Sequence, residues 1–112
     1  MSYNLFLDDE RSPRDVSWIQ LPNDRPYVIV RNIREFQSHI LSNGIDMAHI
    51  SFDNDLGYNE PEGRDCVKWL VEQMLDGILV GRFTYTVHSK NVVAAAWIQQ
   101  YLDRFFESTR DN

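Results

Sequence analysis

The stretch His49-Ile-Ser-Phe-Asp-Asn-Asp-Leu-Gly57 indicates how the whole chain folds. It begins with apolar residues typical of a buried strand and ends in two carboxylates, Asp53 and Asp55. Two other segments share this design: residues 4–11 end in acids and an arginine, and residues 83–91 end in polar side chains. If these strands are parallel neighbours, their polar ends meet at one edge of one sheet. Open α/β sheets place their functional sites outside this edge.

Size and composition point to a single globular domain over residues 1–112. Hydrophobic residues make up 43% of the chain, which supplies one core and excludes a disordered protein. The formal net charge of -6 opposes non-specific coating of duplex DNA. A bound cation or a few arginines could still create a local site for a phosphate or an RNA end. The single cysteine, Cys66, excludes an internal disulfide.

The sequence also bears on where the protein works. Its first residues lack the charged and apolar regions of a signal peptide, and no apolar run approaches the roughly 18 residues needed to span a bilayer. We therefore expect a cytoplasmic protein with no membrane partner.

The pattern of apolar residues predicts strands that alternate with helices. Strands are expected over residues 3–7, 27–30, 48–52 and 83–87. A helix is expected after each of the last three strands, whereas residues 10–26 predict a long loop with a helical turn near Val16–Ile19. This order predicts a largely parallel sheet covered by helices.

Capping signals set the expected ends of the helices. Asn32 is a plausible N-cap for the first helix, with Glu35 as its capping-box partner, and Gly44 ends it. The second helix is expected from about Arg64 to Gly77. Ser89 or Asn91 would cap the last helix, and the polar tail 107–112 is expected to fray. Apolar spacing predicts buried side chains that include Leu41 in the first helix and Leu75 in the second.

Four carboxylates follow two of the predicted strands: Asp8, Asp9, Asp53 and Asp55. Such a group repels itself unless a cation lies among its members or some stay protonated. Mg²⁺ and Mn²⁺ are hard cations that take carboxylate oxygens, water and substrate phosphate. The pattern predicts a metal-binding or phosphate-handling acid pocket. The alternative for Asp8 and Asp9 alone is a solvated acidic turn.

His88 ends the strand expected beside the Asp53 strand, and an imidazole with an ordinary pKa of about 6.5 suits proton transfer. The alternative is a structural histidine, which we also expect for His39 and His49. Ser89 and Asn91 could donate to phosphate oxygens or act as helix caps. Arg11 and Arg31 also fall at strand ends, where each could hold phosphate or pair with a nearby aspartate.

Three segments together resemble one known family. Leu7–Pro13, Ser51–Gly57 and Val87–Asn91 are similar to the motifs of cyclic-phosphate-processing receiver-like domains, which are small proteins of bacteria and phages. The resemblance implies a small three-layer flavodoxin-like or receiver-like α/β fold. Its mostly parallel four-stranded sheet would have the strand order 2-1-3-4, truncated relative to a full receiver domain. It also implies hydrolysis of cyclic phosphate ends, linked to RNA repair.

The chain departs from the family pattern in two places. Asn54 stands between the two acids of the second motif, where the family often has a histidine that could carry a proton. Val92 and Val93 follow the third motif, where proline and glycine are frequent. The chain also lacks the fifth strand and the lysine that a signalling receiver uses.

The leading hypothesis is an enzyme that opens the cyclic phosphate of a nucleotide or RNA end, without an organic cofactor. Two roles fall to the acids: Asp8, Asp9 and Asp53 would hold a divalent cation (Mg²⁺ or Mn²⁺) or position water, and Asp55 would act as a base or orient another group. His88 would protonate the departing ribose oxygen. The phosphate oxygens would be held by Arg11, Ser89 and Asn91. One alternative is a signalling receiver phosphorylated on Asp53. Another is a non-enzymatic acidic interaction protein of phage origin.

Overall fold

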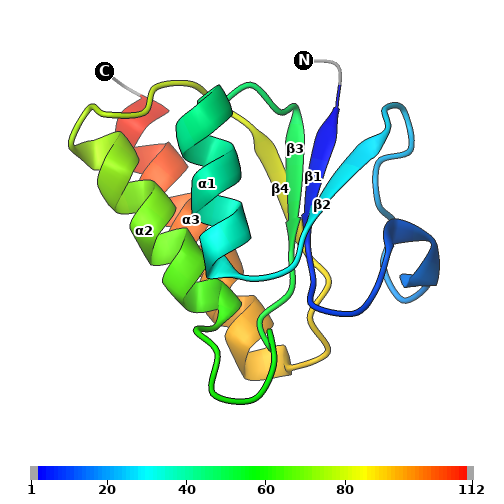
Figure 1. The fold of residues 1–112 in the computed structure, drawn as a ribbon. Helices are drawn as coiled ribbons and strands as arrows, with labels where there is room; N and C mark the ends of the chain where they lie inside the picture. The colour runs from blue at the N-terminus through cyan, green and yellow to red at the C-terminus, as the bar shows by residue number, and fades with distance from the viewer. Residues whose placement is uncertain (1–2, 111–112) are drawn as a thin grey trace.

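The computed structural model describes residues 3–110, which form a four-stranded parallel sheet with three helices (Figure 1). The strands are β1 (Asn4–Leu7), β2 (Tyr27–Val30), β3 (His49–Phe52) and β4 (Thr84–Val87), in the order β2-β1-β3-β4. All three pairings are parallel, so the predicted sheet and its strand order are confirmed.

All three helices lie on the same side of the sheet (Figure 1). They are α1 (Ile33–Asn43), α2 (Gly63–Leu75) and α3 (Val92–Arg110). Their apolar faces pack on the inward side chains of the strands, and this core includes the fully buried residues Leu5, Leu7, Phe36, Ile50, Phe52, Leu70 and Ile98. On the other side, the third layer is the loop after β1, which carries a short 3-10 helix, η1 (Pro13–Asp15).

The helical turn in this loop lies earlier than the sequence predicted. It covers Pro13–Asp15 rather than Val16–Ile19. Pro13 suits the first helical position because its fixed φ is already helical. The backbone N–H and the hydroxyl of Ser12 both donate to the Asp15 carboxylate, at 2.8 and 3.1 Å. This local closure decides the position of the turn.

The caps of α1 and α3 follow the prediction, with one change of partner. Asn32 caps α1, since its Oδ1 accepts the backbone N–H of Glu35 at 2.9 Å. The Glu35 carboxylate accepts the N–H of Arg31 at 2.9 Å, so the capping box does not close on Asn32 itself. Asn91 caps α3 by accepting the N–H of Ala94 at 3.0 Å.

Two predictions about the helix surfaces are wrong. Leu41 and Leu75, expected in the core, are 60% and 65% exposed because the layer of helices is only one deep. The helix α3 extends to Arg110, and fraying of the tail from residue 107 stays a prediction. Within its last turn, the hydroxyls of Ser108 and Thr109 donate to backbone carbonyls of Phe105 and Phe106. Residues 111 and 112 lie outside the described part of the chain.

No helix among residues 3–110 is both long and apolar enough to cross a membrane.

The helix-free face of the sheet is unusually polar. Alternate residues of a strand point to the same face. On the helix-free face, β3 and the position after it place His49, Ser51 and Asp53. In the same way, β4 and the position after it place Thr84, Thr86 and His88 there.

Candidate functional site

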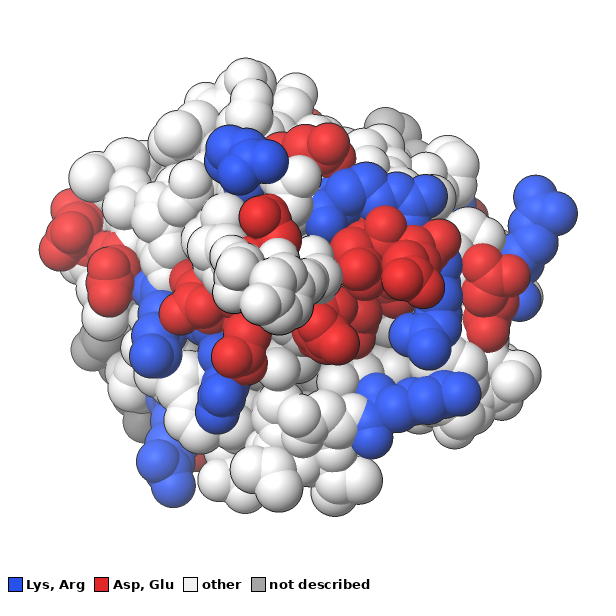
Figure 2. Space-filling view, turned by 60° about the horizontal axis from the view of Figure 1, so that its bottom comes forward, with Lys and Arg blue, Asp and Glu red and all other residues white. Residues whose placement is uncertain are grey.

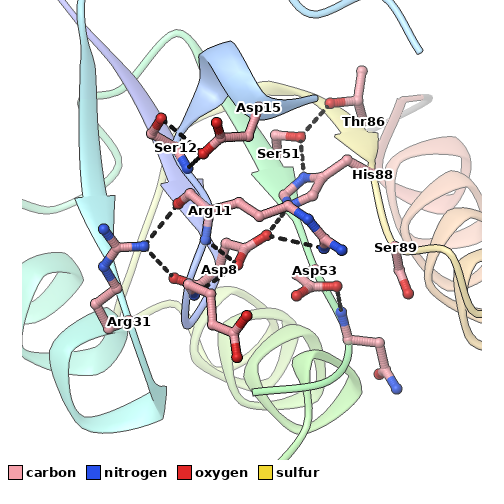
Figure 3. Close-up of polar contacts among 12 residues, drawn as sticks. Asp8, Arg11, Ser12, Asp15, Arg31, Ser51, Asp53, Thr86, His88 and Ser89 are labelled. Carbon is pink, nitrogen blue, oxygen red and sulfur yellow. Dashed lines mark hydrogen bonds and ion pairs between the residues drawn. The ribbon is translucent and has the colours of Figure 1, made fainter. Parts of the chain in front are cut away.

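Asp8 lies at the centre of the site, immediately after β1, and its side chain is fully buried. One carboxylate oxygen, Oδ1, accepts the backbone N–H groups of Glu10 at 2.9 Å and Arg11 at 2.8 Å. The other, Oδ2, is 3.0 Å from Nε2 of His88 (Figure 3). Arg31 closes the same turn from outside, because its Nη1 donates to the carbonyls of Asp8 and Arg11. Arg31 is therefore a structural residue of this turn.

Asp53, at the end of β3, is the second buried carboxylate, and its side chain comes close to Asp8 and His88 (Figure 3). Burial alone would raise the pKa of Asp8, but hydrogen bonds from His88 and from the backbone outweigh it and lower this pKa to about 2. Burial, and then the charge of Asp8, raise the pKa of Asp53 to about 6. Two neighbouring carboxyls thus hold their protons with very different strength.

His88 lies behind Asp8 and has no exposed surface. Its ring stacks on Phe6, with 4.4 Å between the ring centroids and 4° between the planes. Because ionised Asp8 can only accept, Nε2 of His88 must carry the proton of the bond between them. The sequence predicted His88 as a proton donor to the substrate, but in this conformation its Nε2 contacts the Asp8 carboxylate and is not exposed to the cleft.

A chain of hydrogen bonds continues from His88 across the helix-free face of the sheet. Nδ1 of His88 is 2.7 Å from the Ser51 hydroxyl, which is 2.8 Å from the hydroxyl of Thr86 (Figure 3). Thr86 is 3.1 Å from Nε2 of His49, whose Nδ1 is 2.7 Å from the hydroxyl of Thr84. Burial lowers the pKa of His49 to about 4, so this ring is neutral. This series of hydrogen bonds fixes the orientation of the His88 ring at Nδ1, the nitrogen that faces away from Asp8.

A cleft of about 270 Å³ opens beside the two buried carboxyls. It is lined by Asp9, Glu10, Arg11, Asp53, Asp55, Ser89, Lys90 and Asn91. Figure 2 shows the face at the carboxyl ends of the strands, where acidic side chains gather at the centre and Lys and Arg border them. A larger cavity of about 680 Å³ lies along residues 13–27, but it contains none of these acids. The acidic cleft is the better candidate site because charged groups from three strand ends meet there.

The residues predicted to hold phosphate all line this cleft. The guanidinium of Arg11 is 3.8 Å from Oδ2 of Asp8. The Ser89 hydroxyl accepts the N–H of Asn91 at 3.1 Å, and Asn91 caps α3, so both residues also stabilise the start of that helix. Lys90 completes the cationic side of the cleft. Sequence reasoning had not assigned Lys90 to phosphate, although it lies between two residues that were.

Asp9 and Asp55 lie at the acidic side of the cleft and are more accessible than Asp8 and Asp53. Burial raises the pKa of Asp9 above its ordinary value. Asp55 is exposed, and its Oδ1 accepts the N–H of Gly57 at 3.2 Å, which gives it a defined position in the turn. Both residues are therefore placed where a bound molecule could meet them.

Asn54 turns away from the carboxyls toward the start of α2. Its Oδ1 accepts the N–H of Arg64 at 3.2 Å, and its Nδ2 donates to Glu62 at 2.8 Å. The N–H of Gly63 bonds to the backbone carbonyl of Asn54 at 2.8 Å. The side chain at position 54 thus anchors α2 and does not enter the acid cluster. Asparagine in place of the family's frequent histidine at this position therefore affects the contact with the start of α2.

The ligand set also fits a divalent cation. Within residues 3–110, Asp8, Asp53 and His88 each offer one donor atom, and the three atoms lie within 4.8 Å of one another. Asp9, predicted as a ligand, lines the cleft but is not one of these three. Two carboxylates with an imidazole nitrogen suit Mn²⁺ better than Mg²⁺, which prefers oxygen ligands alone.

Comparison with known proteins agrees with this geometry. The family model described as "Cyclic-phosphate processing Receiver domain" matches residues 3–104. The chain belongs to this family. No curated protein and no solved structure matches it. The matched range contains every strand and all the residues of the cleft, so the strand-end motifs that suggested the family are the ones the fold brings together.

Several residues of the site were not found from the sequence. Ser51, Thr84 and Thr86 form the hydrogen-bonded chain behind His88, yet their hydroxyls look like ordinary strand residues. A signal was present, because polar residues at positions 49, 51 and 53 and at 84, 86 and 88 have the strand period of two. A polar face on a strand in the middle of a sheet is uncommon and indicates a site or a buried network.

Proposed function

We propose that the cleft opens the ring of a cyclic phosphate on a nucleotide or a nucleotide end by adding water. The observation that carries this proposal is the pair of buried carboxyls with opposite pKa shifts, about 2 for Asp8 and about 6 for Asp53. Neighbouring acids whose environments separate their pKa values are typical of acid–base catalysis. The family to which the chain belongs acts on cyclic phosphates, which agrees with a cleft that has both acids and cations.

In the proposed reaction, water attacks phosphorus while the bond from phosphorus to one ribose oxygen breaks. Asp53 gives its proton to that oxygen, because its raised pKa of about 6 leaves a larger protonated fraction near neutral pH than an ordinary aspartate has. The exposed carboxylate of Asp55 takes a proton from the attacking water. The products are a phosphate monoester and a free ribose hydroxyl, and solvent returns the proton from Asp55 to Asp53.

Other residues support the step without exchanging protons with the substrate. Arg11, Lys90, Ser89 and Asn91 line the cleft and would hold the phosphate oxygens. His88 would act through Asp8, because its hydrogen bond favours the ionised form of Asp8 and the Asp8 charge raises the pKa of Asp53. This role differs from the direct proton donation expected from the sequence, and the full burial of His88 supports it.

A divalent cation is a further part of the proposal. Asp8 and Asp53 would hold it, and His88 would join them only after its Nε2 loses the proton that it donates to Asp8. A cation bound there would neutralise charge on the phosphate oxygens. A carboxylate bound to a cation stays ionised, so Asp53 cannot bind the cation and donate a proton in the same step. Rates of cyclic phosphate hydrolysis in EDTA and in Mn²⁺ distinguish proton donation by Asp53 from cation binding by Asp53. Proton donation predicts activity in EDTA that falls as the pH rises through about 6.

Turnover of a 2′,3′-cyclic nucleotide by purified variants tests the function. Asp53→Asn should lower kcat by about 10²- to 10⁴-fold, the usual effect of removing an acid or base. Asp76→Asn is the matched control, because Asp76 is an exposed aspartate at the end of α2 outside the cleft, and its kcat should stay at the wild-type value. Equal rates for wild type and Asp53→Asn would reject the proposed acid.

The signalling alternative has less support. The sheet of residues 3–110 has four strands, so the described part of the chain offers no fifth strand to carry the lysine that a signalling receiver uses. Incubation with acetyl phosphate and Mg²⁺ followed by intact mass measurement distinguishes the two functions. A phosphorylated species that disappears in Asp53→Asn would favour the signalling module over the hydrolase.

A further inference from the structure

Trp18 connects the loop on the helix-free face to the end of β4. Its indole N–H donates to the backbone carbonyl of His88 at 2.8 Å, although 70 positions separate the two residues in the chain. Buried or half-buried tryptophans usually satisfy this donor, so the bond fixes where the ring lies. The ring is thereby held next to the segment that carries Ser89, Lys90 and Asn91.

Two cations of the cleft lie against this ring. The Lys90 ammonium is 4.2 Å from the ring centroid, and the Arg11 guanidinium carbon is 5.1 Å from it. Both distances fall within the range of about 6 Å in which a cation is attracted to an indole face. Arg11 comes from the turn after β1 and Lys90 from the end of β4, so one ring contacts the cations from two separate strand ends. Trp18 itself does not line the cleft.

This contact matters because the cleft is acidic. Asp9, Glu10, Asp53 and Asp55 share its walls with Arg11 and Lys90. Free lysine and arginine side chains have many rotamers, and nearby carboxylates compete for them. A cation held on an aromatic ring is already positioned before an anion arrives. The arrangement therefore favours anion binding in a region whose overall charge opposes it.

We propose that Trp18 is a positioning residue that holds Arg11 and Lys90 together at the cleft for the phosphate of a bound nucleotide. The inference rests on the proposed function only in assigning phosphate to this cleft. Trp18 does not touch the phosphate, and its effect is exerted entirely through the two cations and the backbone of His88.

Binding of inorganic phosphate to the full chain, measured by calorimetry, tests the inference without requiring turnover. Trp18→Leu removes both the ring and the N–H, and we expect phosphate affinity to fall by about 10-fold, within the range of two cation–π contacts. Trp18→Phe keeps a ring but loses the N–H, so it should lose about 3-fold. It also guards against misfolding, because Phe retains most of the packing of the larger ring.

Trp97 provides a matched control. Two cations also lie near its ring, Arg64 at 5.9 Å and Lys68 at 5.5 Å, but the three residues belong to α2 and α3 and none lines the cleft. Trp97→Phe should leave phosphate affinity at the wild-type value. A loss equal to that of Trp18→Phe would show a general effect of removing a tryptophan and would overturn the inference.

A double-mutant cycle separates positioning from a merely structural effect. In the wild-type background, Lys90→Gln should weaken phosphate binding by about 5-fold, the upper end of the effect of one exposed cation. In Trp18→Leu the same change should cost less than about 2-fold, because the lysine is no longer held. Equal losses in both backgrounds would overturn the inference. Absence of phosphate binding by the wild-type protein would also overturn it, even if the cyclic nucleotide is hydrolysed.

Discussion

At the scale of single residues, Asp8 and Asp53 differ in what holds their charge. Asp8 receives two backbone N–H groups and the imidazole of His88, whereas Asp53 receives one backbone N–H, from Asn54 at 2.8 Å. A carboxylate with several donors stays ionised even when buried. The second carboxyl then meets both low solvation and a fixed negative neighbour, so it releases its proton only at higher pH than an ordinary aspartate.

The raised pKa of Asp53 predicts that this residue lowers the stability of the free protein at neutral pH. Its pKa in the folded protein, about 6, lies above its ordinary value of 3.8, so folding favours the protonated form. Stabilisation from this group is complete below pH 4 and is lost as the pH rises through 6. In metal-free buffer at pH 7.5, Asp53→Asn should therefore raise the free energy of unfolding by roughly 1 to 3 kcal/mol.

Urea unfolding of wild type and Asp53→Asn at pH 7.5 and pH 4 measures this difference. The gain should fall below about 1 kcal/mol at pH 4, where Asp53 is protonated in the folded protein and partly protonated in the unfolded one. A variant less stable than wild type at pH 7.5 would contradict the account of Asp53.

The hydrogen bonds of Asp8 predict the protonation of the His88 ring. In Asp8→Asn, the amide oxygen can keep the bonds from Glu10 and Arg11, so the amide NH₂ faces Nε2 of His88. Two donors cannot share a hydrogen bond, so Nε2 must lose its proton and Nδ1 must donate to Ser51. Long-range ¹H–¹⁵N spectra of the ring report this change directly. An Nε2 that lacks a proton in the wild-type protein would contradict it.

At the scale of elements, the start of α2 is packed directly against the end of β3. Gly63 begins the helix, and a methyl group at this position would lie 1.9 Å from the Asp53 carbonyl oxygen. No rotamer relieves this contact, because the obstacle is backbone. The close approach lets the helix bond to Asn54 and fixes the segment that carries Asp53, the proposed acid.

Gly63→Ala should therefore lower stability by at least about 3 kcal/mol and reduce turnover as well, since Asp53 must move. Gly44→Ala is the control for a new methyl group. Nothing lies within 4 Å of that position, so its cost of about 1 to 3 kcal/mol comes only from its backbone conformation, φ 74° and ψ -163°. Thermal unfolding with parallel rate measurements compares them. Equal losses, with turnover retained in Gly63→Ala, would show that the contact does not position Asp53.

Local patterns predicted the elements well where they were self-contained. Short apolar and β-branched runs located all four strands. Asn32 and Asn91 were recognisable caps because an N-cap depends only on its own next turn. Errors arose where tertiary packing decides. Leu41 and Leu75 have helical spacing, but nothing in the sequence tells that no second layer of helices covers them.

At the scale of the whole molecule, the fold gathers opposite charges on one face of an acidic protein. Sequence motifs predicted that Asp8, Asp53 and His88 would meet, because parallel strands end at the same edge. They did not predict that His88 is fully buried and bonded to Asp8. Nor did they predict that Trp18, from the loop after β1, donates to the backbone carbonyl of His88. Burial and contacts between distant segments have no signature in local spacing, so roles that depend on them needed the structure.

The cluster of possible metal ligands, formed by Asp8, Asp53 and His88, predicts that Mn²⁺ stabilises the folded protein. A ligand that binds only the folded state adds about 2.7 kcal/mol at 100 times its Kd. Thermal unfolding at pH 7.5 should show a higher Tm with Mn²⁺ for wild type and a smaller rise for Asp53→Asn. Asp55→Asn is the control, since Asp55 lies outside the cluster and should keep the full rise. No rise in the wild-type Tm at millimolar Mn²⁺ would remove the cation from the proposed function.

The central claim is that the acids and cations at the carboxyl ends of the strands open a cyclic phosphate. The most direct measurement is ³¹P NMR of a 2′,3′-cyclic nucleotide incubated with the wild-type protein, in EDTA and in Mn²⁺. The account predicts that the cyclic phosphate signal is replaced by that of a monoester, and that Asp53→Asn leaves the cyclic signal intact over the same period. A wild-type sample whose cyclic signal persists under both conditions would contradict the claim and favour a non-enzymatic role.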